Sequence, residues 1–388
     1  MLTPKAQTKA HIFFPNLDGL RFISFFVVFL HHCYLSFFSY LRGSSPTAWQ
    51  VQSFLFKYGT LGVNFFFVLS GFLITYLLLK EKELTGTVHV GNFYVRRILR
   101  IWPLYFLCLF IGFVVFPLLK KMSGEIPHES ANPWNYIFLA ANFDYLHTWT
   151  TKPDAILLSV LWSVAVEEQF YLTWPIILRF VPVKYYKYVF GSIMLFSLVF
   201  RAFHTHCTDA DYAMRYFHTF SLIGDMALGG MLAYYVSFPN KIKDWLTNLG
   251  RPAVILIYAG TLCVTLLKDY IFPCGIPVIF ERLVIGTFFA LIIAEQNFAR
   301  GSIIKLGRLK LLSKLGTYTY GLYCLHLLAM YITVRLIVRL HWNEQKLWVA
   351  VSSAIIALAL SIVISVLSYN LFEKWFLRLK NKFAFITK

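Results

Sequence analysis

The chain has 388 residues, of which 58% are hydrophobic, 19% aromatic and 14% charged. A soluble domain carries about 25% charged residues, so this composition excludes an ordinary soluble protein and makes lipid the solvent for most of the surface. The formal net charge of +18 does not indicate a nucleic-acid partner, because the basic residues lie beside apolar segments and form no single solvated patch.

Apolar windows of about twenty residues predict an all-α, polytopic membrane protein with about ten transmembrane helices. The predicted helices lie near residues 20–40, 59–79, 101–119, 163–182, 187–203, 217–237, 253–268, 277–296, 315–338 and 348–371. A further stretch, 134–146, is too short to span, and we expect it to lie in the membrane interface or to re-enter the bundle. Because short connections join the segments, we predict a single integral-membrane domain over residues 1–388.

The basic residues predict the orientation. If the N-terminus is cytoplasmic, 24 of the 36 Lys and Arg residues fall in cytoplasmic segments. The positive-inside rule therefore predicts that both termini are cytoplasmic, and an even number of helices agrees with this. We expect the first apolar run, which is long enough to span, to act as an uncleaved anchor in the inner membrane.

The six cysteines are scattered and form no CxxC pair, so we predict no metal site. They are Cys33, Cys108, Cys207, Cys263, Cys274 and Cys324. Two of them, Cys207 and Cys274, are predicted on the outer side, where pairing is one option.

Arg21 and His32 share one face of the first predicted helix. They are eleven residues apart, which is three turns plus about 20° of rotation and about 16 Å along the axis. Arg21 then lies at the cytoplasmic mouth and His32 beyond the midplane. Ionisable groups inside a span are functional candidates. On this helix alone, headgroup contact by Arg21 and a hydrogen bond from His32 to a neighbouring helix explain them somewhat better.

Arg97 and Arg100 lie at i,i+3 on one helix face at the same mouth. Two guanidinium groups suit phosphate, because each offers a planar, bidentate and permanently charged fork. We therefore predict a phosphorylated ligand that enters from the cytoplasm. Ordinary positive-inside anchoring is the alternative.

Two adjacent carboxylates, Glu167 and Glu168, precede a spanning segment. Ser163 shares a helix face with Glu167, whereas Glu168 is rotated by about 100°. A carboxylate there would orient a histidine and support its positive charge. The helix dipole favours a carboxylate at a helix start, but this explains one glutamate better than two.

Weaker candidates are Asn64 in a helix rich in small residues, Asp225 in a span that ends in two glycines, and His326, a second buried imidazole. Small residues usually indicate close helix packing, and we expect Asp225 to pair with a cation. Each is more often structural than catalytic.

Taken in order, these segments resemble the acyltransferase-3 family, whose members are membrane acyltransferases of cell-surface glycans. The similarity extends from Leu17 to Glu373. Its marks are Arg21 with ten residues before His32, the run Phe67–Phe72, Arg97-x-x-Arg100 with Pro103 and Tyr105, Trp162-Ser163 through Glu167-Glu168-Gln169-Phe170-Tyr171, Tyr323-x-x-His326, and Glu373. Five motifs in order, followed by the matching Glu373, make chance similarity improbable.

Two departures from the family pattern stand out. The family often has Asp where this chain has Asn64, which removes a charge and keeps a hydrogen-bonding group. It also often has an Arg shortly before the position of Asp225, where this chain has Ser221, Leu222 and Ile223. A role for that family arginine in contacting the acceptor therefore cannot be assigned to any residue at this place in the chain.

The resemblance implies an acyl-CoA donor, by default acetyl-CoA, that enters from the cytoplasm, and a glycan or glycolipid hydroxyl as acceptor at the outer side. No cofactor is expected to be bound permanently. Arg21, Arg97 and Arg100 would then bind the CoA phosphates, and the pantetheine arm would extend along the helix to His32. His32 would act as general base or as a transient acyl carrier, oriented by Glu167 or Glu168. We therefore expect the arginines and His32 to line one cavity.

Two other functions remain open from the residues alone. A transporter or flippase of a glycan or lipid intermediate would use the buried charges along a conduction path, but no inverted repeat or matching pair of broken helices is visible. A non-catalytic scaffold would leave the arginine–histidine face and the paired glutamates without a purpose. The sequence identifies neither the acceptor, the acyl chain nor the oligomeric state.

Overall fold

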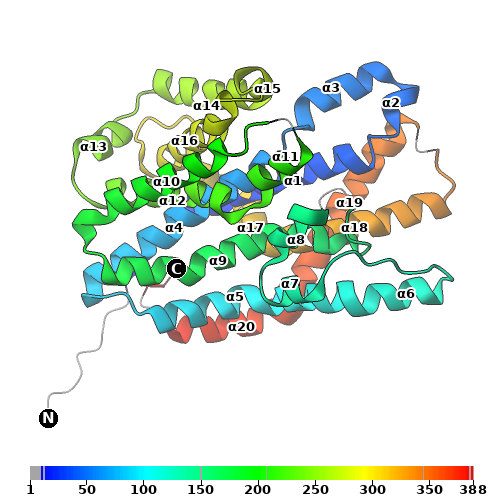
Figure 1. The fold of residues 1–388 in the computed structure, drawn as a ribbon, viewed down its shortest axis with the longest axis horizontal. Coiled ribbons are helices and arrows are strands. Elements are labelled where there is room, and N and C mark those ends of the chain that lie inside the picture. The colour runs from blue at the N-terminus through cyan, green and yellow to red at the C-terminus, as the bar shows by residue number, and fades with distance from the viewer. Residues whose placement is uncertain are drawn as a thin grey trace, which may run out of the picture.

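The computed structural model describes residues 10–11, 14–148, 151–206, 208–343, 345–383 and 386–387. Long helices dominate it, and many of them run along the long axis of the molecule (Figure 1). They are α1 (Pro15–Ser36), α4 (Leu61–Thr85), α5 (Val90–Phe110), α9 (Leu161–Phe180), α10 (Tyr186–Ala202), α12 (Thr219–Ser237), α14 (Arg251–Leu266), α16 (Pro277–Phe298), α18 (Thr319–Arg339) and α19 (Leu347–Ser368). A helix satisfies its own backbone groups, as apolar segments in lipid require.

Short elements extend or connect the long helices. The short α-helices are α2 (Leu41–Ser44), α3 (Pro46–Phe56), α6 (Phe116–Met122), α7 (Pro133–Ile137), α8 (Ala141–Thr148), α11 (Asp209–Phe217), α13 (Lys241–Thr247), α15 (Lys268–Ile271), α17 (Lys310–Thr317) and α20 (Lys374–Lys380). The 3₁₀ and π turns are η1 (Ile111–Val115), η2 (Ile156–Val160), η3 (Val183–Tyr185), η4 (Leu306–Arg308), η5 (Tyr369–Glu373) and η6 (Asn381–Phe383). Two strands of two residues each, β1 (Ala10–His11) and β2 (Ile386–Thr387), pair in parallel.

Each of the ten predicted ranges overlaps a long helix, but not all of these helices qualify as spans. Among the described residues, seven helices are long and apolar enough to cross a membrane, or eight if α13 and α14, which are bent by 93°, form one span. The chain is therefore a multi-pass membrane protein, and the count of ten spans stays a prediction. The third helix begins at Val90 rather than near residue 101, so Arg97 and Arg100 lie inside α5.

The stretch 134–146 does not cross the bundle as one helix. It forms α7 and α8, which are joined through Leu139 with a positive φ of 57°. Both helices are far shorter than a span, and α8 packs on α9 and α11. The prediction that this stretch is too short to span is confirmed.

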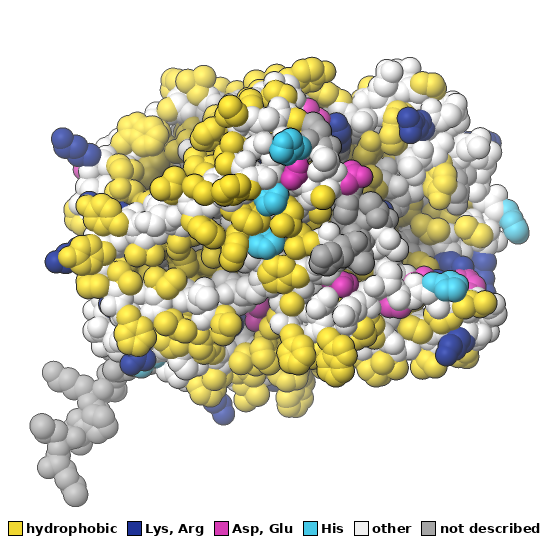
Figure 2. Space-filling model, viewed as in Figure 1, with side chains coloured by type: hydrophobic (Ala, Val, Ile, Leu, Met, Phe, Trp, Pro, Cys, Tyr) yellow, Lys and Arg dark blue, Asp and Glu magenta, His cyan; other side chains and the backbone are white. Residues whose placement is uncertain are grey.

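The outer surface of the bundle is apolar. Figure 2 shows hydrophobic side chains over most of one face, with Lys and Arg mostly toward the two ends. On α14, for example, Leu256 and Leu262 are 70% and 60% exposed. Such exposure is favourable only if lipid covers these side chains.

Glycines allow the central helices to approach closely. A Cβ atom at Gly71 of α4 would lie 2.0 Å from the carbonyl oxygen of Met226 in α12, and one at Gly229 of α12 would lie 2.0 Å from that of Val68. These two helices therefore meet backbone to backbone, as the small residues predicted. Gly316 of α17 approaches the carbonyl oxygen of Asp18 in α1 equally closely.

Among the described residues, four cysteines are free, namely Cys33, Cys108, Cys263 and Cys324. Cys274, in the connection between α15 and α16, is disulfide-bonded. The pairing partner considered from the sequence, Cys207, lies outside the described residues.

Candidate active site

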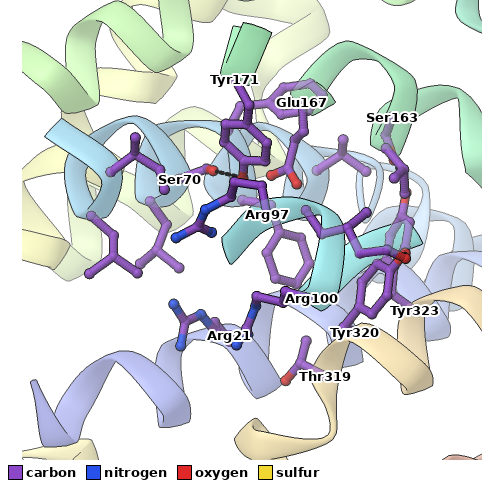
Figure 3. Close-up of a pocket in the computed structure, with 18 of the residues that line it drawn as sticks. Arg21, Ser70, Arg97, Arg100, Ser163, Glu167, Tyr171, Thr319, Tyr320 and Tyr323 are labelled. Atoms are coloured by element: carbon purple, nitrogen blue, oxygen red, sulfur yellow. Dashed lines mark hydrogen bonds between the residues drawn. The ribbon is translucent and has the colours of Figure 1, made fainter. Parts of the chain in front are cut away.

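A cavity lies among α1, α4, α5, α9, α17 and α18, and it contains about 860 Å³ of atom-free space when its open mouth is counted. Its apolar walls include Val63, Phe66, Leu69 and Val164. Its polar lining, labelled in Figure 3, comprises Arg21, Ser70, Arg97, Arg100, Ser163, Glu167, Tyr171, Thr319, Tyr320 and Tyr323. Side chains that are far apart in the sequence thus converge on one space inside the bundle.

Three guanidinium groups lie at one end of this cavity. Arg21 is paired with Asp18 at 2.7 Å. The guanidinium carbon of Arg97 lies 5.4 Å from the ring centroids of both Phe93 and Tyr171, and its Nε is buried without a hydrogen bond. Within the part of the chain that the structure describes, no carboxylate forms an ion pair with Arg97 or Arg100. This end of the cavity therefore suits an anion.

Hydroxyl groups line the cavity along α9 and at its other end. The Oγ of Ser163 lies 2.7 Å from the Tyr323 hydroxyl and donates to the carbonyl of Val160 at 3.1 Å, so Tyr323 is the donor between the two hydroxyls. Further along α9, the Tyr171 hydroxyl lies 2.5 Å from Ser70 Oγ. Glu167 lies between Ser163 and Tyr171 on the same face and points into the cavity (Figure 3).

The two adjacent glutamates have different surroundings. Glu168 is not among the lining residues, and its Oε2 accepts a hydrogen bond of 2.8 Å from the indole N–H of Trp102. Its Oε1 is buried without a partner. The rotation of about 100° between neighbouring helix positions separates the two carboxylates, so that Glu167 faces the cavity and Glu168 ties α9 to α5.

His32 is not among the residues that line this cavity, contrary to the expectation of one shared space. Its Nδ1 lies 2.9 Å from Nε2 of His326. The ring of Tyr323 contacts the ring of His326, with centroids 6.1 Å apart. The helix period places Arg21 and His32 on one face of α1, but of the two only Arg21 lines the cavity.

The expected contact between His32 and a carboxylate is also not present among the described residues, where His326 is the hydrogen-bond partner. Of the two glutamates on α9, Glu167 lines the cavity and Glu168 accepts a hydrogen bond from Trp102. His326, a weak candidate in the sequence, is therefore the side chain that contacts His32.

The remaining candidates lie away from the cavity. The Tyr105 hydroxyl donates to the carbonyl of Tyr136 at 2.7 Å and ties α5 to α7. Asn64 is buried, and its Nδ2 has no hydrogen bond. Asp225 pairs with a cation, as expected: its Oδ2 lies 2.6 Å from Nη2 of Arg282 in α16. No group of three or more His, Cys, Asp and Glu residues in the described part of the chain is arranged to hold a metal ion.

Several lining residues were not among the sequence candidates, namely Ser70, Tyr171, Thr319, Tyr320 and Tyr323. The spacing of Tyr171, four residues after Glu167, was a usable signal, because i,i+4 positions share a helix face. Ser70 and Tyr323 lie within two of the motifs that carry the family resemblance, whereas Thr319 and Tyr320 of α18 lie in none of them, and only the folded arrangement brings these two to the cavity.

The comparisons with known proteins agree with this picture. The family model described as an acyltransferase domain matches residues 14–369. The peptidoglycan O-acetyltransferase OatA of Listeria monocytogenes is 26% identical over 377 residues, which cover 92% of this chain and 55% of that protein. The O-acetyltransferase OatA of Staphylococcus aureus is 28% identical over 230 residues, 57% of this chain and 34% of that protein. The chain spans about half the length of the curated relatives it matches, and no solved structure matches it.

Proposed function

The chain belongs to the acyltransferase-3 family, and from this membership we propose that it is a membrane O-acetyltransferase that transfers the acyl group of acetyl-CoA to a hydroxyl of a cell-envelope glycan. The relatives named O-acetyltransferase support the reaction, and the peptidoglycan named for the Listeria protein supports a glycan acceptor. Because the chain spans about half of that relative, the activity and acceptor of the whole relative are carried over only as a proposal.

The observation that carries the proposal is the cavity with its arginine-lined end. CoA bears several phosphate groups and a long, thin pantetheine arm. Arg97 and Arg100 offer guanidinium groups without a carboxylate partner among the described residues, and such groups bind phosphate by charge-assisted, bidentate hydrogen bonds. We assign the CoA phosphates to this end, and the acyl end to the hydroxyls of Ser163 and Tyr323.

The direction of transfer is proposed from the two ends of the bundle. Arg21 lies in the first third of α1, and Arg97 and Arg100 lie in the first third of the span Val90–Met122. The distribution of Lys and Arg favours a cytoplasmic location for that end. The disulfide-bonded Cys274 lies near the start of α16, at the opposite end from Asn16, which bonds the carbonyl of Gln296 late in the same helix. Disulfides persist in oxidising compartments. We therefore propose that the donor enters from the cytoplasm and that the acceptor is bound at the outer side of the inner membrane.

His32 is the proposed catalytic group, as general base toward the acceptor hydroxyl or as a transient acyl carrier. It lies about three turns beyond Arg21 on α1, on the proposed acceptor side of Tyr323. Glu167 is proposed to act inside the cavity. Glu167 and His32 make no direct contact among the described residues, so Glu167 is not proposed to orient His32.

The test uses sealed membrane vesicles of known orientation, supplied with radiolabelled acetyl-CoA on one side and peptidoglycan fragments or other envelope glycans on the other. We expect label in the glycan only when acetyl-CoA is on the cytoplasmic side, and no label with an inserted His32→Ala variant. Full transfer by that variant removes His32 from the mechanism. Movement of glycan without acylation favours the transporter function instead.

A further inference from the structure

Two imidazole rings meet inside the bundle, one from α1 and one from α18. His32 Nδ1 and His326 Nε2 are 2.9 Å apart, and the ring centroids are 5.0 Å apart. A hydrogen bond between two nitrogens requires a proton on only one of them. The ring that carries this proton determines which nitrogen of His32 is available for chemistry.

The surroundings of His326 decide the direction of this hydrogen bond. Its Nδ1 lies 2.8 Å from the carbonyl oxygen of Tyr323 and 3.2 Å from that of Leu322. A carbonyl oxygen only accepts, so Nδ1 of His326 carries a hydrogen. The ring is fully buried, and the rings of Phe25 and Phe29 flank it. A buried charge without a carboxylate partner is costly, so His326 is neutral and its Nε2 carries a lone pair.

The tautomer of His32 follows from that of His326. Because His326 Nε2 accepts, His32 Nδ1 donates, and Nε2 of His32 is left without a hydrogen. No partner is recorded for this Nε2 among the described residues, and the ring of His32 is only partly buried. Both a general base and an acyl carrier need such a free lone pair.

We infer that His326 is a positioning residue that fixes the Nδ1–H tautomer of His32 and thereby keeps Nε2 of His32 basic and available to the acceptor hydroxyl. This inference rests on the proposed function for its catalytic meaning. It gives to a neutral imidazole the role that a carboxylate has in a catalytic triad. No negative charge then has to be buried beside His32 in the apolar bundle.

The proton balance with His32 as the base is simple. The acceptor hydroxyl passes its proton to Nε2 of His32 while its oxygen bonds to the acyl carbon. The carbon–sulfur bond of the thioester breaks, and the leaving thiolate of CoA takes the proton from Nε2. During the step both nitrogens of His32 carry hydrogens, and Nδ1–H remains bonded to Nε2 of His326.

The first test does not depend on activity. The full chain is labelled with ¹⁵N-histidine and reconstituted in nanodiscs, and the ring nitrogen signals are assigned with His32→Gln and His326→Asn variants. We expect His32 to be protonated at Nδ1 and bare at Nε2, and His326 likewise. A His32 ring protonated at Nε2 in the unmodified protein overturns the inference, whatever the enzyme does.

The second test compares two substitutions of similar size. His326→Gln keeps an oxygen acceptor near the former Nε2, whereas His326→Asn places its amide near the former Nδ1 and loses that acceptor. We expect the Gln variant to keep about a tenth or more of kcat and the Asn variant to lose about a hundredfold or more, with KM for acetyl-CoA unchanged in both. Equal losses contradict a positioning role. If His32→Ala retains transfer, the proposed role of His32 fails, but the tautomer measured by NMR stands.

Discussion

The hydroxyl groups of Ser163 and Tyr323 lie 2.7 Å apart and close the cavity on the side nearest to the two histidines. Phe66 packs edge-on against the ring of Tyr323, with centroids 5.9 Å apart. Phe66, Ser163 and Tyr323 thus bound this end of the cavity, here called the narrow end, away from the arginines. If the thioester lies at the narrow end, these side chains limit the length of the acyl group.

Phe66→Ala should relax this limit. Removing the ring enlarges the narrow end, and a hydrophobic pocket discriminates by about 10- to 200-fold for each methylene. We expect the ratio of kcat/KM for butyryl-CoA over acetyl-CoA to rise about tenfold or more, as measured by transfer to one glycan acceptor. Leu69→Ala, which alters a different part of the apolar wall, serves as the control. The acyl end is placed wrongly if both variants keep the original ratio.

Arg97→Gln should weaken donor binding and leave the fold intact. Hydrogen bonds to charged groups contribute about 1.5–3 kcal/mol, so loss of one guanidinium should raise KM for acetyl-CoA about 10- to 100-fold. The neighbouring Arg96 is the matched control, because it bonds Glu81 at 2.9 Å and the carbonyl of Phe383 at 2.8 Å, outside the cavity lining. Arg96→Gln should lower the unfolding temperature and keep KM unchanged. Similar changes in KM for the two variants would contradict a phosphate role for Arg97.

The sequence predicted best what the helix period determines. Arg97 and Arg100 share a face three residues apart, and the structure places both in one cavity with Arg21. The same period separated Glu167 from Glu168 by about 100°, but which of them faces the cavity depends on how α9 is rotated within the bundle. That rotation follows from packing against several helices at once.

Contacts between distant segments could not be predicted in this way. His32 and His326 are 294 positions apart, and no local pattern indicates which helices become neighbours. The start of α5 was also missed, because residues 90–100 mix apolar and basic side chains and a window for uniformly apolar residues passes over them. Apolarity detects the lipid-facing length of a helix and misses its amphipathic end.

The buried pair of Asp225 and Arg282 should be strongly coupled. Nε and Nη2 of Arg282 donate to one carboxylate oxygen at 3.1 and 2.6 Å, and both side chains are buried. Asp225→Asn leaves an uncompensated buried guanidinium, which should cost about 3–5 kcal/mol of unfolding free energy. The double variant Asp225→Leu with Arg282→Met should recover most of this lost stability, as measured by denaturant unfolding in detergent.

The control is an exposed ion pair. Lys57→Ala, which breaks an exposed pair with Asp269, should cost about 1 kcal/mol or less. A double variant that is no more stable than Asp225→Asn would show that the two residues are not coupled.

Asp154 should make the connection before α9 sensitive to acid. Its carboxylate accepts from the ammonium of Lys120 and, at 3.1 Å, from the backbone N–H of His128. Burial by itself raises the pKa of Asp154, but the hydrogen bonds from Lys120 and His128 outweigh it and hold this pKa below its usual range.

The sign of the pH effect follows from this lowered pKa. A carboxyl group whose pKa is lower in the folded protein stabilises the fold above its unfolded pKa of about 3.9 and loses this contribution as the pH falls through the folded pKa. Asp154→Asn should therefore lower the unfolding temperature by about 1–3 °C at pH 7, and the difference from the unmodified protein should shrink below about pH 4. Glu125→Gln, which breaks a more exposed pair with Arg335, should change the unfolding temperature less at pH 7. Thermal unfolding in detergent between pH 7 and pH 3 measures both variants. A difference for Asp154→Asn that persists undiminished at pH 3 would show that its effect does not come from the ionised carboxylate.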